Sequence, residues 1–111
     1  MPAPGEHHPA FEEYCECIYE LHEDDVEVIQ ARIADRLEVS RPAVSEMIRK
    51  LESVGLITND GRIALTAEGQ ALAERVVRRH RLAERFLTDI LKLSWAEAHH
   101  EAGRLEHVMS A

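Results

Sequence analysis

The middle of the chain carries the feature that most constrains its fold, an ordered series of helix-capping and turn signals. Ser40 is a favourable N-cap, and the proline two residues later suits the first turn of a helix. Gly55 is placed to end that helix. The pair Asp60-Gly61 then stands between two short apolar runs, which indicates a β-hairpin, and Thr66 can cap the next helix. The series predicts a helix, a hairpin and a further helix in succession.

Apolar side chains recur every three or four residues in two segments before this series. The segments Phe11–Glu23 and Ile29–Leu37 are therefore expected to form amphipathic helices. Between them, residues 26–28 alternate apolar and charged side chains, which predicts a very short strand. Two short helices joined by a tight turn are typical of a helix-turn-helix, and a hairpin directly after them forms a wing.

Two more helices are expected after the hairpin. Residues 67–92 contain no proline and predict one long helix, and Ser94 can cap a last helix from Trp95 to about Met109. The predicted fold class is mainly α: a winged helix-turn-helix with a small β-hairpin wing, followed by a long arm helix and one further helix. Residues 1–9 include three prolines and are expected to form a flexible tail.

The formal net charge of −8 argues at first against nucleic acid as a partner. The charge is unevenly distributed, because residues 1–29 contain nine acids and no Lys or Arg, whereas residues 30–85 contain eleven bases and eight acids. The basic side chains thus coincide with the predicted winged helix and arm helix. DNA therefore stays a candidate partner.

Composition also limits where the chain is expected to work. No apolar run approaches the roughly 18 residues of a membrane span, and the polar start lacks the features of a signal peptide. The two cysteines, Cys15 and Cys17, do not make a disulfide framework. A cytoplasmic, reduced protein with no membrane partner is the simpler interpretation.

The helix after Ser40 would enter the DNA major groove with its N-terminus first. Serine hydroxyls near that end, Arg49 and Lys50 one turn later, and Arg62 at the wing tip can contact phosphates. Glu46 can accept a hydrogen bond from cytosine N4 if it is held at a base edge. Solvated basic residues on a small helical domain are the alternative. The candidate DNA-binding residues are Arg32, Ser40, Arg41, Pro42, Ala43, Ser45, Glu46, Arg49, Lys50 and Arg62.

Carboxylate and imidazole side chains recur at helical spacing on three of the predicted helices. Spacings of three or four residues place the members of a group on one helix face. The groups could converge on a cation, although such pairs are also common on solvated helices. Oxygen and nitrogen ligands without thiolate suit Mn²⁺ or Fe²⁺, and Zn²⁺ or Co²⁺ can compete. The candidate ligands are Glu13, Glu16, His80, Glu84, His99, Glu106 and His107.

Five stretches carry a family resemblance: Glu13-Tyr14, Ile18–Leu21, Ala31–Leu37, Arg79–Arg85 and Glu106–Ser110. Together they resemble the diphtheria toxin repressor family of metal-dependent transcription regulators, which includes iron-dependent and manganese-transport regulators. The resemblance covers about residues 10–111. It implies that the chain is a metal-dependent repressor of metal-homeostasis genes and not an enzyme. Such a repressor would bind a palindromic operator in double-stranded DNA as a homodimer.

The resemblance also implies a role for each candidate ligand. Glu13 stands at the first-helix ligand, which is methionine in iron-type and aspartate in manganese-type members, and Glu16 at the second manganese-type carboxylate. Because neither position offers sulfur, Mn²⁺ is favoured over Fe²⁺. The histidine and carboxylate of the family's arm helix fall on His80 and Glu84. A further histidine of the family's ancillary site falls on His99, and the closing Glu-His pair falls on Glu106 and His107.

Two positions depart from the family pattern. Gly103 stands where iron-type members have cysteine and manganese-type members glutamate, so one side-chain ligand is missing. Glu46 stands where iron-type members have glutamine, so their operator sequence does not carry over. Because family members continue beyond this stretch, residues 71–111 are expected to form the metal-binding and dimerisation helices of an incomplete dimerisation domain, after a DNA-binding domain at residues 10–70.

Three alternatives stay open at this point. The chain can be a winged-helix DNA-binding protein without a working metal switch, or a truncated family fragment that does not dimerise. The third is a metalloenzyme with a dinuclear carboxylate site. Against it, the sequence has no His-Glu-x-x-His motif and lacks the two Glu-x-x-His motifs of di-iron bundles.

Overall fold

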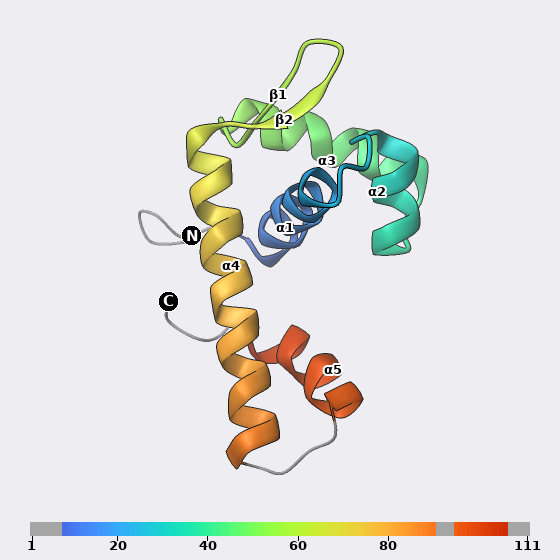
Figure 1. Ribbon diagram of the computed structural model, residues 1–111. Helices are drawn as coiled ribbons and strands as arrows, with labels where there is room; N and C mark the ends of the chain where they lie inside the picture. The colour runs from blue at the N-terminus through green and yellow to red at the C-terminus, as the bar shows by residue number, and fades with distance from the viewer. Residues whose placement is uncertain (1–7, 91–94, 107–111) are drawn as a thin grey trace. The chain divides into compact units, whose positions relative to one another are not determined.

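The computed structural model describes residues 8–90 and 95–106 (Figure 1). It divides into two compact units, residues 1–73 and residues 74–111. The described part of the chain holds no helix that is long and apolar enough to cross a membrane. Most of the predicted tail, the predicted cap Ser94 and the predicted helix end near Met109 lie outside the described residues.

Three helices begin the first unit: α1 (Pro9–Glu23), α2 (Gln30–Leu37) and α3 (Arg41–Ser53). The Ser40 side chain accepts a hydrogen bond from the Ala43 backbone N–H at 3.2 Å, so the predicted N-cap is confirmed. The helices begin and end close to the predicted positions. Because α1 contacts α2 and α2 contacts α3, they form the predicted helix-turn-helix with one supporting helix.

The wing is an antiparallel hairpin of β1 (Ile57–Asn59) and β2 (Ile63–Leu65). Ile57 pairs with Leu65, and Gly61 in the connecting loop has φ 101°. Glycine suits this conformation because it has no Cβ. The hairpin projects from the three helices of its unit (Figure 1), and the predicted winged helix-turn-helix is confirmed.

Thr66 joins the wing to the next helix through both roles of its hydroxyl group. The hydroxyl accepts a hydrogen bond from the Gly69 N–H at 3.1 Å and donates one to the Gly55 carbonyl oxygen at 2.6 Å. A Cβ added at Gly69 would overlap the backbone oxygen of Leu56. This turn therefore needs glycine at its fourth position for space.

The core of the first unit lies where α1, α2, α3 and the hairpin meet. Each large apolar side chain that is fully buried contributes roughly 1.5–3 kcal/mol relative to exposure. The core therefore holds α3 and the wing in fixed positions within this unit. Its fully buried members include Ile18, Leu21, Ile33, Val44, Ile48, Leu51, Leu56 and Ile57.

The very short strand predicted at residues 26–28 is wrong. Among the described residues the sheet has two strands, β1 and β2. The Val26 N–H instead donates to the Leu21 carbonyl oxygen at 2.9 Å, and Asp25 adopts φ 55°. The backbone donor that a strand would pair is thus used to close the C-terminus of α1.

The long helix predicted over residues 67–92 is only partly correct. The α-helix α4 (Ala67–Arg85) ends before a π-helical turn, Phe86–Ile90. The Thr88 hydroxyl donates to the Glu84 carbonyl oxygen at 2.8 Å, and such a side-chain bond competes with the regular backbone pairing of an α-helix. The sequence pattern does not reveal this change of helix type.

The last described helix, α5 (Trp95–Leu105), packs against the π-helical turn in the second unit. Ala83, Leu87 and Ala102 form a small buried core, and Leu105 packs against it. Alanine at two of these positions lets the helices approach closely. This small core holds together the helical segments that carry the polar side chains of the second unit.

Candidate metal centre

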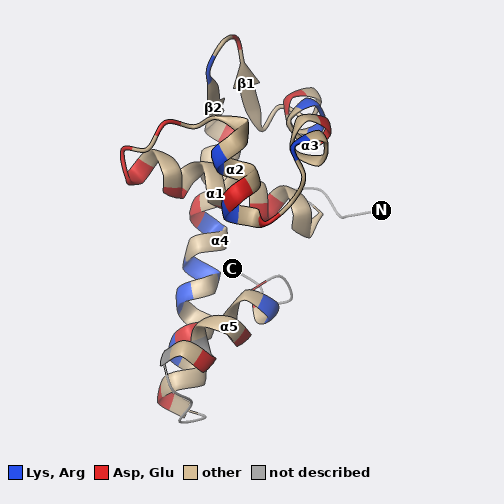
Figure 2. Ribbon diagram, turned by 90° about the vertical axis from the view of Figure 1, so that its right-hand side faces the viewer, with Lys and Arg blue, Asp and Glu red and all other residues tan. Residues whose placement is uncertain are grey.

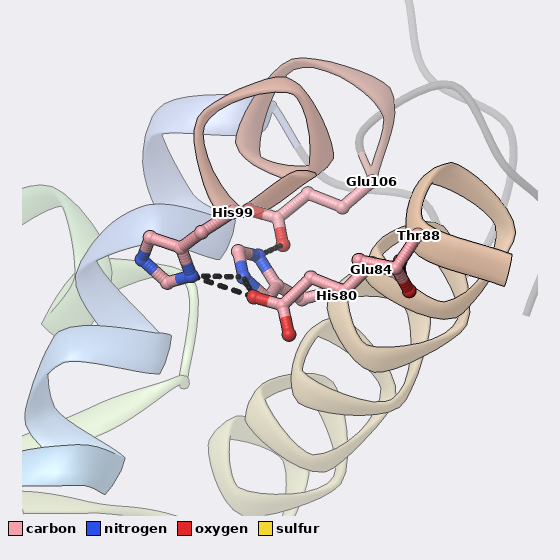
Figure 3. Close-up of polar contacts among 5 residues, drawn as sticks. All are labelled: His80, Glu84, Thr88, His99 and Glu106. Carbon is pink, nitrogen blue, oxygen red and sulfur yellow. Dashed lines mark hydrogen bonds and ion pairs between the residues drawn. The ribbon is translucent and has the colours of Figure 1, made fainter. Parts of the chain in front are cut away.

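His80 on α4 lies at the centre of a polar cluster in the second unit (Figure 3). Its Nε2 atom is 2.6 Å from Oε1 of Glu84, one turn further along α4. His99 on α5 places Nδ1 2.6 Å from the same carboxylate oxygen and 3.3 Å from His80 Nε2. Two imidazoles from two helices thus converge on one carboxylate.

Glu106, directly after α5, approaches the opposite edge of the His80 imidazole. Its Oε2 atom lies 2.7 Å from His80 Nδ1. Glu106 is 3% exposed and Glu84 8% exposed, so both carboxylates are largely removed from water. We call the four residues His80, Glu84, His99 and Glu106 the His80 cluster.

The His80 cluster is electrostatically unusual because one imidazole lies between two buried carboxylates. A ring that donates from both nitrogens is an imidazolium. The hydrogen bond to Glu106 raises the pKa of His80 to about 9, against the opposing effect of burial and with further support from Glu84. In the metal-free chain His80 is therefore charged at neutral pH.

This charge makes the stability of the metal-free chain depend on pH. The folded pKa of His80 lies above its ordinary value of 6.5, so the stabilisation is complete below about pH 6.5 and is lost as the pH rises through about 9. We expect the free energy of unfolding of the wild type to exceed that of His80→Gln at pH 6. This difference should shrink by pH 9.5, as measured by urea unfolding in a chelator. A difference that grows with pH would contradict the assignment.

The donor atoms of the His80 cluster fit a divalent cation. One ligand atom each from His80, Glu84 and His99 lies within 4.8 Å of the others. Two imidazole nitrogens with one carboxylate oxygen suit Mn²⁺, Fe²⁺, Zn²⁺ or Co²⁺. A cation among these atoms would replace the proton on His80 Nε2 and keep the Glu84 charge neutralised.

Within the second unit, the structure brings four of the seven predicted ligands together: His80, Glu84, His99 and Glu106. Glu13, which is exposed, and Glu16, which is half-buried, lie on α1 in the first unit. His107 lies outside the described residues. No atom lies within 4 Å of the position that a Gly103 Cβ would occupy, so there is open space where the family pattern has a ligand side chain.

The predicted DNA-binding residues lie on the first unit, and Figure 2 shows basic residues on α3 and in the hairpin loop. Arg32 on α2 and Arg62 in the loop are exposed. Glu46 pairs with Lys50 at 3.4 Å, so both charged groups lie on one face of α3. Ser45 is half-buried, and the exposed candidates on or next to α3 are Ser40, Arg41, Pro42, Ala43, Glu46, Arg49 and Lys50.

Two family models match the chain. The N-terminal DNA-binding domain of iron-dependent repressors matches residues 8–65. The metal-binding and dimerisation domain of iron-dependent repressors matches residues 66–111.

Individual relatives agree with these matches. The iron-dependent repressor IdeR of Mycobacterium tuberculosis is 48% identical over 101 residues, which cover 89% of this chain and 44% of IdeR. The diphtheria toxin repressor of Corynebacterium diphtheriae is also 48% identical, over 89% of this chain and 45% of its own length. This chain thus spans less than half the length of these relatives.

Solved structures give the same picture. The manganese regulator SloR matches with a TM-score of 0.80 at 43% identity, covering 90% of this chain and 47% of SloR. A manganese-dependent transcriptional repressor in complex with manganese matches with a TM-score of 0.84 at 40% identity, with the same coverage of both chains.

Proposed function

Because the chain belongs to the iron-dependent repressor family, whose members are metal-dependent transcriptional repressors and not enzymes, we propose that it binds duplex DNA when a divalent cation is bound. The observation that carries the proposal is the convergence of two imidazoles on the Glu84 carboxylate. The DNA target would be a palindromic operator of metal-homeostasis genes, bound by a homodimer.

Mn²⁺ is the cation we propose, with Fe²⁺ second and Zn²⁺ or Co²⁺ able to compete in vitro. Thiolate ligands would favour ions that prefer sulfur. The two cysteines of the chain are poor sources of thiolate. Burial raises the pKa of Cys15 to about 12 and that of Cys17 to about 11, so both stay protonated at neutral pH. The donors at hand are therefore carboxylate oxygens and imidazole nitrogens.

The proposed ligands are His80 Nε2, Glu84 Oε1 and His99 Nδ1. When bound, a cation would supply positive charge that holds α4 and α5 together at the His80 cluster. Family resemblance adds Glu13, Glu16, Glu106 and His107 to the proposed set. A cation that binds the DNA-competent arrangement more tightly than other arrangements shifts the population toward it.

DNA recognition is proposed for the exposed face of α3. The helix begins at Arg41 and carries Arg49 and Lys50 on exposed positions, where they can neutralise phosphates. Arg62 in the wing is placed for a further backbone or minor-groove contact. In a homodimer the two recognition helices would read half-sites one DNA turn apart.

Fluorescence anisotropy with a labelled pool of randomised duplex DNA tests the proposal. Mn²⁺ is expected to lower the dissociation constant at least about tenfold, and a chelator should restore the metal-free value. The double variant Glu13→Gln, Glu16→Gln tests separately whether the carboxylates of α1 take part in metal binding. If its DNA binding depended on Mn²⁺ as that of the wild type does, both residues would be removed from the proposed site.

Gly103 favours a second candidate, a winged-helix DNA-binding protein without a working metal switch. The open space at this position provides no side-chain donor. DNA affinity that is equal with and without Mn²⁺ would support this candidate and contradict the first.

Base preference gives a further test, centred on Glu46. This carboxylate can accept from cytosine N4, while Lys50 at 3.4 Å offsets its repulsion of the DNA backbone. We expect DNA selected from the randomised pool by the wild type to contain cytosine at one position of the site. DNA selected by Glu46→Gln should prefer a different base at that position. A good pair discriminates by about 1–3 kcal/mol, so the preference should be at least about fivefold. Identical selected sequences would exclude Glu46 from base recognition, and Glu52→Gln is the control on the same helix.

A further inference from the structure

A cavity in the first unit supports an inference that is independent of the candidate metal centre. The cavity measures about 200 Å³ and lies between the C-terminal half of α1, the connection between α1 and α2, β2 and the first turn of α4. We propose that it binds a small organic ammonium ion, namely a primary amine that carries one apolar ring or one branched alkyl group.

The interior of the cavity offers an apolar surface from three segments. Ile18 of α1 and Ile63 of β2 are buried, while Val28 of the connection and Leu65 of β2 are half-buried. An apolar cavity of roughly 150 Å³ can hold a benzene ring. A cavity of about 200 Å³ therefore has room for one ring and a short chain. Transfer of such an apolar group out of water favours binding.

The exposed residues of the cavity are suited to a head group that donates hydrogen bonds. His22 and Glu23 stand in the last turn of α1, and both line the cavity at exposed positions. A carboxylate oxygen and an imidazole nitrogen can accept hydrogen bonds, and an ammonium group donates three. An ammonium head group can thus bind at the carboxylate of Glu23, where an anionic head group would be repelled.

The charges around the cavity favour the same sign of ligand. Asp24, Asp25 and Glu27 follow α1 and are exposed, and residues 1–29 contain no Lys or Arg. One of these charges is partly offset, because Arg36 pairs with Asp24 at 3.8 Å. A surface lined by one sign of charge raises the local concentration of the opposite ion. Cations are therefore attracted to this face, and anions of the same size are disfavoured.

The position of the cavity gives its occupant an effect on the first unit. α1 packs against β2, which is a strand of the wing. A ligand in contact with both would restrain the wing relative to α1. Because it binds the folded unit and not the unfolded chain, it should also raise the urea concentration at which this unit unfolds.

NMR titration of the ¹⁵N-labelled full chain with 2-phenylethylamine tests the proposal, in a chelator so that metal plays no part. We expect a dissociation constant on the order of 1 mM for so small a ligand. The largest shift changes should fall on the backbone amides of Ile63 and Leu65. Phenylacetate has the same ring with the opposite charge, and methylamine has the charge without the ring. Each should bind at least about fivefold more weakly, because each loses one of the two contributions.

Two variants and a matched control locate the site. Glu23→Gln keeps the size of the side chain and removes its charge, and it should weaken 2-phenylethylamine binding about two- to fivefold, as expected for an exposed charge pair. Val28→Phe places a ring in the cavity and should remove measurable binding. Glu27→Gln changes an exposed acid that does not line the cavity and should bind the amine like the wild type.

Several results would overturn the proposal. One is the absence of shift changes at Ile63 and Leu65 with about 10 mM 2-phenylethylamine, ten times the expected dissociation constant. Equal affinity for methylamine, or equal losses in Glu23→Gln and Glu27→Gln, would indicate general attraction of cations to an acidic surface. If Val28→Phe does not fold, the comparison of these two glutamine variants decides. All of these results are independent of the metal site and of DNA binding.

Discussion

Replacing His99 by alanine is expected to weaken Mn²⁺ binding by about 100-fold or more. Loss of a residue that only supports a metal ligand costs about 10- to 100-fold in metal affinity, and loss of a ligand should cost at least the upper value. His99 supplies Nδ1 at 2.6 Å from Glu84 Oε1, so the variant removes one of three converging donor atoms. The His99 side chain is 65% exposed, and its removal therefore disturbs little packing. Isothermal titration calorimetry with MnCl₂ measures the change.

His100 is the matched control for this variant. It is the next residue on α5 and is also exposed, but it takes no part in the His80 cluster. The Mn²⁺ dissociation constant of His100→Ala should lie within about twofold of the wild-type value, a much smaller change than the loss of a ligand causes. Equal losses in both variants would indicate a general effect on α5 and would remove His99 from the site.

Gly69→Ala is expected to lower the free energy of unfolding of the first unit by about 3 kcal/mol or more, the upper range for overpacking. The added methyl group would overlap the Leu56 backbone oxygen, which accepts from the Thr66 N–H at 3.0 Å. Relief would require moving the backbone that joins the wing to α4. Urea unfolding followed by circular dichroism measures the loss.

Gly103→Ala serves as the control in the same assay. Gly103 lies inside α5, and no atom lies within 4 Å of its Cβ position. Alanine there should stabilise the helix by about 0.5–1 kcal/mol, because glycine loses more backbone entropy in a helix. If Gly69→Ala proved as stable as Gly103→Ala, the close packing of the turn against Leu56 would be refuted.

Local signals in the sequence were sufficient to predict the winged helix-turn-helix. The Ser40 cap, the Gly61 turn and the Thr66 cap each depend on hydrogen bonds or backbone angles within a few residues. The strand predicted at residues 26–28 failed because alternation describes the side chains only. The Val26 N–H was already taken by the end of α1.

The candidate metal centre was only partly predictable. The pair His80 and Glu84 follows from helical spacing, because residues four apart share a face. Contact of His80 with both His99 and Glu106 depends instead on how α5 packs on the preceding helical segment through Ala83 and Ala102. Spacing within one helix carries no information about that packing, and family resemblance assigned ligands without revealing the Glu106 contact to Nδ1.

The most direct test of metal-dependent DNA binding is the Mn²⁺ affinity of the chain measured with and without saturating duplex DNA. Coupling between two binding sites is reciprocal, so DNA must tighten Mn²⁺ binding by the same factor by which Mn²⁺ tightens DNA binding. The proposed function predicts a factor of at least about ten, which His99→Ala should abolish and His100→Ala should preserve. Equal Mn²⁺ affinities in the free and DNA-bound chain would contradict a metal-dependent repressor.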